Sequence, residues 1–131
     1  IGENKGTGTA IRMVSLSGKT TITNNEIKDV TKNGINLYNY SSAVDLTITG
    51  NTISNWDSDK DTNTIGGRAI RIEFNNQTGS ATITGNTFTP PAYEAEFTPV
   101  DPEYVKITGS TSVTKNFEWP SDWTEGKLLV N

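Results

Sequence analysis

Polar and apolar residues alternate in a short segment that recurs along the chain. Leu-Thr-Ile-Thr-Gly-Asn-Thr-Ile at 46–53 returns as Ala-Thr-Ile-Thr-Gly-Asn-Thr-Phe at 81–88, and looser copies occupy 20–27 and 105–112. Each copy sets an apolar residue between two polar ones, which is typical of a β-strand with one side chain turned inward. The apolar residue is an isoleucine in every copy, at Ile22, Ile48, Ile83 and Ile107. Successive isoleucines are 26, 35 and 24 positions apart. The repeat predicts a β-solenoid, in which the four isoleucines form one buried row and the longest step contains an insertion.

In each copy the strand pattern is followed by residues typical of a sharp bend. A second strand pattern precedes three of the copies. Pairs such as Gly50-Asn51 accept positive φ angles at low cost, so they predict a turn. If like residues stack on like, the turn asparagines form a hydrogen-bonded ladder of Asn25, Asn51 and Asn86. The second pattern is Ala-Ile-Arg-Met at 10–13, Gly-Ile-Asn-Leu at 34–37 and Ala-Ile-Arg-Ile at 69–72. Near the end of the chain, segment 113–117 is an alternative to Ile107 for the fourth place in the buried row.

The Ile-Thr-Gly-Asn-Thr-Ile unit, with the Asn-Gly-Ile strand start at 33–35, resembles the right-handed parallel β-helix repeats of the pectin-lyase-like superfamily. The resemblance covers about residues 7–115. It implies an all-β fold, a right-handed parallel β-helix (solenoid) of about four coils. We expect residues 1–131 to be a single β-helix domain or a fragment of a longer β-helix. The aromatic segment 115–131 is expected to cap the open end of the core, and an aromatic ligand platform is the alternative.

Composition narrows the classes of function. A length of 131 residues indicates one domain, and a hydrophobic content of 32% suits the narrow core of a solenoid. The chain has neither Cys nor His, which excludes thiolate chemistry, Ser-His-Asp triads and His-metal sites. A net charge of −4 argues against a nucleic-acid partner. No run of about 18 apolar residues exists, so we expect no membrane span.

A polar segment at 56–68 accounts for the longest step between copies. Oxygen-bearing side chains alternate there, at Asp57, Asp59, Asp61 and Asn63. This spacing resembles the start of an EF-hand calcium loop, although Thr62 and Arg68 replace the Gly and Glu that such a loop requires. Two interpretations stay open, a solvated acidic loop and a Ca²⁺ site. We expect no other cofactor.

The second strand pattern also predicts a polar outer face. If the apolar residues of this pattern point inward, Arg12, Asn36 and Arg71 point outward and stack, with Tyr38 and Glu73 two residues further along. Arginine and asparagine can hold carboxylates and hydroxyls. In the β-helix enzymes that this chain resembles, such a face forms the saccharide groove. The alternative is the plain polar surface that any solenoid has.

No catalytic residue is assigned. Glycoside hydrolysis needs two carboxylates across a cleft, and of the polygalacturonase-like motifs only Arg71-Ile72-Glu73 is partly matched. The leading interpretation is a non-catalytic secreted or cell-surface bacterial module, a scaffold or adhesion domain that contacts polysaccharide or cell-surface glycans, within a longer chain that has flanking domains. The alternatives are a fragment of a polysaccharide lyase or glycoside hydrolase acting on acidic polysaccharide, and a phage tail-spike segment.

Overall fold

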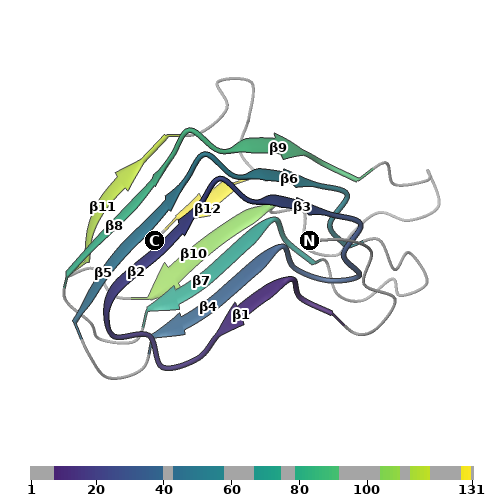
Figure 1. Cartoon of the computed structure of the whole chain (residues 1–131). Helices are drawn as coiled ribbons and strands as arrows, with labels where there is room; N and C mark the ends of the chain where they lie inside the picture. The colour runs from purple at the N-terminus through teal and green to yellow at the C-terminus, as the bar shows by residue number, and fades with distance from the viewer. Residues whose placement is uncertain are drawn as a thin grey trace.

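The chain is built from β-strands that pair in parallel (Figure 1). The computed structural model describes residues 8–39, 43–57, 67–74, 79–91, 104–109, 113–118 and 128–130. Within these ranges there is no helix, and therefore none that is long and apolar enough to cross a membrane. The all-β prediction is confirmed for this part of the chain.

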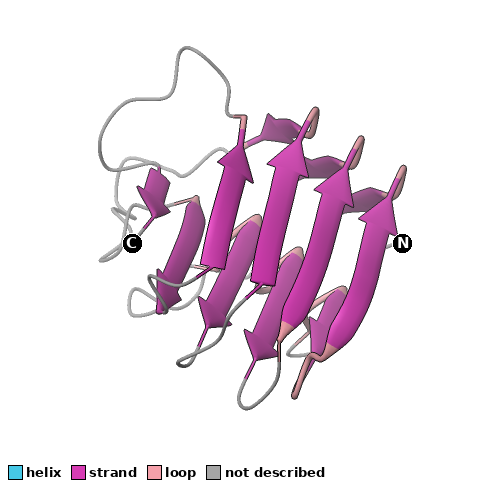
Figure 2. Ribbon diagram, turned by 90° about the vertical axis from the view of Figure 1, so that its left-hand side faces the viewer, coloured by secondary structure: helices cyan, strands magenta, loops and turns pink. Residues whose placement is uncertain are grey.

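The strands form three sheets (Figures 1 and 2). The first sheet has the order β1-β4-β7-β10-β12, formed by Ile11–Met13, Ile35–Asn39, Ile70–Phe74, Val105–Gly109 and Leu128–Val130. The second has the order β11-β8-β5-β2, formed by Val113–Phe117, Gly79–Thr84, Val44–Thr49 and Gly18–Thr23. The third has the order β3-β6-β9, formed by Glu26–Lys28, Thr52–Ser54 and Thr87–Thr89.

The chain visits the sheets in a fixed cycle. Strands β1 to β9 pass through the first, second and third sheet in turn, three times, and β10 and β11 begin a further cycle. Each strand therefore pairs with its counterpart in the next cycle rather than with its neighbour in sequence. This arrangement is compatible with a parallel β-solenoid.

The core lies between the sheets and is organised in rows. In the second sheet Ile22 lies beside Ile48 and Ile48 beside Ile83, and all three are at most 4% exposed. The third sheet stacks Ile27, Ile53 and Phe88 in the same way. The rows form because inward residues alternate with outward ones, so parallel pairing in register sets like side chains side by side.

The fourth member of the isoleucine row was predicted wrongly. Ile107 is buried, but it lies in the first sheet beside Ile72, whereas Phe117 lies beside Ile83 in the second sheet. The physical reason is that Val105 and Ile107 both point inward and match Ile70 and Ile72. The segment therefore continues the second strand pattern, and 113–117 takes the fourth place in the row.

The bends between the second and third sheets occur at residues that accept positive φ angles. Gly50 and Gly85 have φ angles of 66° and 62°, and Asn24 takes the equivalent position with a φ of 55°. L-residues other than asparagine and aspartate rarely adopt this conformation, which explains why Gly and Asn recur at this place in the repeat.

Candidate functional site

Basic side chains gather on the outer face of the first sheet. Register places Arg12 on β1 beside Asn36 on β4, Asn36 beside Arg71 on β7, and Arg71 beside Lys106 on β10. Adjacent strands of a parallel sheet are about 4.8 Å apart, so neighbouring side chains in this row can act on one ligand. We call Arg12, Asn36, Arg71 and Lys106 the basic row.

A second row lies two residues further along the same strands. Tyr38 on β4 is beside Glu73 on β7, and Glu73 is beside Thr108 on β10. The two rows are joined within β4, where Asn36 Nδ2 donates to Tyr38 Oη over 3.5 Å. The structure thus brings all five side chains predicted for this face onto adjacent strands.

Asn36 lies in the row predicted for it, but its side chain is buried. Arg12 is exposed and Arg71 is half-buried, but Asn36 is only 7% exposed. The reason is its place in the register, because longer side chains flank it on both neighbouring strands and at Tyr38 on its own strand. Among the described residues its Oδ1 atom has no hydrogen-bond partner, and the atom is closed to solvent. A buried amide oxygen left without a partner costs about 1–3 kcal/mol, and a ligand hydroxyl would reach this one only if the side chains around it moved.

Lys106 adds positive charge that the sequence interpretation missed. Partial burial, with Arg68 and Arg71 close by, lowers the pKa of its ammonium below the ordinary value of 10.5. Like charges held together in this way favour an anionic partner. The signal was present in Val105-Lys106-Ile107, which matches Ile70-Arg71-Ile72, but the segment was assigned to the turn repeat instead.

The turn asparagines form hydrogen bonds from one strand cycle to the next. The backbone N–H and Nδ2 of Asn25 donate to Asn51 Oδ1 over 2.9 and 3.0 Å. The same two groups of Asn51 donate to Asn86 Oδ1, each over 3.0 Å. Asn51 Nδ2 also donates to the carbonyl of Ile22, and Asn86 Nδ2 to that of Ile48. These contacts hold the second and third sheets at a fixed angle, so they serve the scaffold.

A second set of polar contacts lies where the third sheet leads back to the first. Asn33 Oδ1 accepts from the backbone N–H of Arg68 over 2.9 Å, and Asn33 Nδ2 donates to Thr9 Oγ1. Asp57 is only 8% exposed, with its backbone N–H bound to the carbonyl of Lys32. Of the two interpretations left open for this segment, the solvated loop does not hold at Asp57, which packs against the preceding cycle.

The calcium prediction falls mostly outside the described part of the chain. Asp59, Asp61 and Asn63 are not among the described residues, and Asp57 is the member of the set that is. Among the described residues, no group of three or more acidic, His or Cys side chains could hold a metal ion. The Ca²⁺ site therefore stays a prediction of the sequence.

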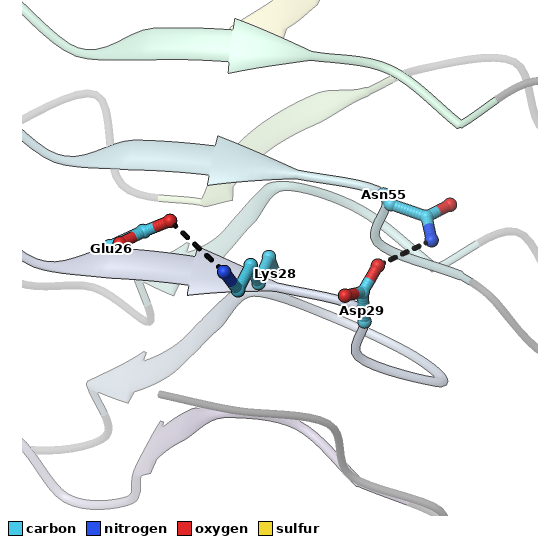
Figure 3. A network of polar contacts seen from close by, with 4 residues as sticks. All are labelled: Glu26, Lys28, Asp29 and Asn55. Atoms are coloured by element: carbon cyan, nitrogen blue, oxygen red, sulfur yellow. Dashed lines mark hydrogen bonds and ion pairs between the residues drawn. The ribbon is translucent and has the colours of Figure 1, made fainter.

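Polar contacts on the third sheet were not foreseen from the sequence. Lys28 Nζ lies 3.3 Å from Glu26 Oε1, and both side chains are at least half exposed (Figure 3). Just beyond these strands Asn55 Nδ2 donates to Asp29 Oδ1 over 2.7 Å. Asp29 and Asn55 both have positive φ angles, so this pair stabilises a bend.

Among the described residues, the outer face of the first sheet is where positively charged side chains lie on neighbouring strands. It combines clustered cations, a buried amide oxygen, a phenol and one carboxylate, and it contains no His or Cys. Such a set can bind an anion or a hydroxyl-rich ligand. Within the described strands of this sheet Glu73 is the one acidic residue, whereas acid–base hydrolysis of a glycoside uses two. Comparison with known proteins found no matching family model, and the searches of curated proteins and of solved structures likewise returned no match.

Proposed function

We propose that this chain is a non-catalytic module of a secreted or cell-surface protein, and that it binds acidic glycans through the basic row. In this proposal the fold is a right-handed parallel β-helix of about four coils, similar to the pectin-lyase-like superfamily. Because β11 and β12 include residues 115–117 and 128–130 in the sheets, the proposed cap is narrower than the predicted segment 115–131. The module acts as a scaffold or adhesion domain within a longer chain.

The observation that carries the proposal is the stacking of Arg12, Asn36, Arg71 and Lys106 across four adjacent strands. A polysaccharide with a carboxylate on each sugar presents charges at regular intervals. A row of guanidinium and ammonium groups, whose backbone positions are fixed by the sheet, can meet them through charge-assisted hydrogen bonds. The Tyr38 hydroxyl, beside Asn36 on β4, adds a polar group for sugar hydroxyls.

Binding to polygalacturonate, measured by calorimetry with neutral dextran as the control polymer, tests the proposal. The double variant Arg12→Ala/Arg71→Ala is expected to weaken binding at least tenfold. The matched control is Lys19→Ala/Lys28→Ala, which removes the same charge from the second and third sheets and should leave affinity within about twofold. Equal losses in both double variants would show that net charge, rather than the basic row, governs binding.

The enzyme alternative is decided with the same polymer. A β-elimination reaction yields an unsaturated product that absorbs in the ultraviolet, so turnover is followed directly with and without Ca²⁺. We expect no product. A Ca²⁺-dependent product that disappears in Arg71→Ala would replace this proposal with a polysaccharide lyase.

A further inference from the structure

The outer face of the second sheet carries the same short motif on three adjacent strands. The motif is Thr-Ile-Thr, at 21–23 on β2, 47–49 on β5 and 82–84 on β8. In each copy the isoleucine points into the core and is at most 4% exposed. The two threonines therefore point outward, and their register forms two straight rows, Thr21–Thr47–Thr82 and Thr23–Thr49–Thr84. We call these six residues the threonine array.

The array is open to solvent and carries no charge. Thr21 and Thr23 are exposed, and the four threonines on β5 and β8 are half-buried. Charged groups border it among the described residues. Lys19 and Asp45 lie in the flanking row with Ser80, whose Oγ donates to Asp45 Oδ1 over 2.9 Å. The exposed Glu118, directly after β11, lies beside Thr84 at the end of the second row. On β11 the first row continues with Asn116, which is exposed.

The geometry of the array is that of a small two-dimensional lattice. Threonines in one row are separated by the parallel strand spacing of about 4.8 Å, and the two threonines on one strand by about 6.6 Å. Threonine is β-branched and restricted at χ1, so each methyl and hydroxyl group has few directions to adopt. The buried isoleucine row and the asparagine ladder fix the backbone beneath them. Figure 2 shows these strands side by side and nearly parallel.

We propose that the threonine array binds ice. A prism face of ice presents neutral water oxygens on a rectangular lattice whose two repeats are close to the two spacings of the array. Hydroxyl groups placed on such a lattice can replace surface water molecules, and the methyl groups fill the hollows between them. Each threonine contributes little, but six held rigidly engage the crystal at once, and this multiplies the effect.

A polysaccharide fits this face less well than ice does. Flat sugar-binding surfaces depend on aromatic rings for stacking, and β2, β5 and β8 carry no aromatic residue. An acidic polymer would also need cations, and the array has none. The array lies on a different sheet from the basic row, so this inference does not depend on the proposed glycan function.

The test measures thermal hysteresis, the gap between melting and freezing of a seeded ice crystal, together with uptake of the fluorescently labelled protein into growing ice. The protein is expected to show a gap and to enter the ice. Thr47→Lys, at the centre of the array, should reduce the gap at least fivefold. Thr89→Lys, the same change on an exposed threonine of the third sheet, should leave it unchanged.

Two milder variants guard against a loss of folding. Thr47→Val keeps the β-branched shape and removes only the hydroxyl, whereas Thr47→Ser removes only the methyl. Each should reduce the gap while the circular dichroism and urea midpoint stay close to those of the parent. Exclusion of the parent protein from ice, or equal loss in Thr47→Lys and Thr89→Lys, would overturn the proposal. Binding to crystalline cellulose without any hysteresis would overturn it in favour of a polysaccharide surface.

Discussion

The buried isoleucine row predicts a large effect for a single truncation in its centre. Ile48 is fully buried and lies between Ile22 and Ile83 on the neighbouring strands of the second sheet. Ile48→Ala removes three carbon groups, each worth about 0.8 kcal/mol on burial. It also leaves a cavity that neighbours held in a parallel ladder cannot easily fill. We therefore expect a loss of about 3–5 kcal/mol in the free energy of unfolding, the upper part of the range for such changes.

Urea denaturation followed by circular dichroism measures this loss as a fall in the midpoint at constant slope. Val14→Ala is the control, because Val14 is 51% exposed and its truncation should change stability by no more than about 0.5 kcal/mol. Ile22→Ala is the graded case, because Ile22 lies on the terminal strand of the sheet, where the site can relax. A loss below about 1 kcal/mol for Ile48→Ala would refute the reasoning that this row forms the core.

Two further predictions concern the polar groups. Asn51→Ala should lower the free energy of unfolding by about 2–4 kcal/mol, because Asn51 is 1% exposed and its removal leaves buried partners of several hydrogen bonds unsatisfied. Asn25→Ala, at the end of the ladder, should cost less than half as much in the same urea assay. Because the pKa of Lys106 is lowered in the folded protein, the unfolded chain binds the proton more tightly. The free energy of unfolding of the parent, relative to that of Lys106→Gln, should therefore rise as the pH is raised from neutral toward 10.5. Midpoints that keep a constant difference across this range would contradict the electrostatic description of the basic row.

Local features of this protein can be predicted from its amino-acid sequence. Alternation of apolar and polar residues predicted the strands and the inward side of each, since side-chain direction in a strand depends only on a period of two. Gly50, Gly85 and their asparagine neighbours predicted the bends, since the turn conformation depends on residue type. Stacking equivalent turns of the repeat predicted hydrogen bonds between their asparagines. Asn25 and Asn51 form such a bond, and so do Asn51 and Asn86.

Which segments become neighbours depends on how the whole chain packs. The residues Val105-Lys106-Ile107-Thr108-Gly109 fit both repeat patterns, and the choice between them depends on pairing with β7, more than thirty residues away in sequence. That pairing moved Ile107 out of the predicted row and brought Lys106 beside Arg71. It also decided the burial of Asn36, which depends on side chains from two other strands. Register in a parallel sheet is set by packing between segments distant in sequence, so a local pattern can give the direction of a side chain but not its neighbours.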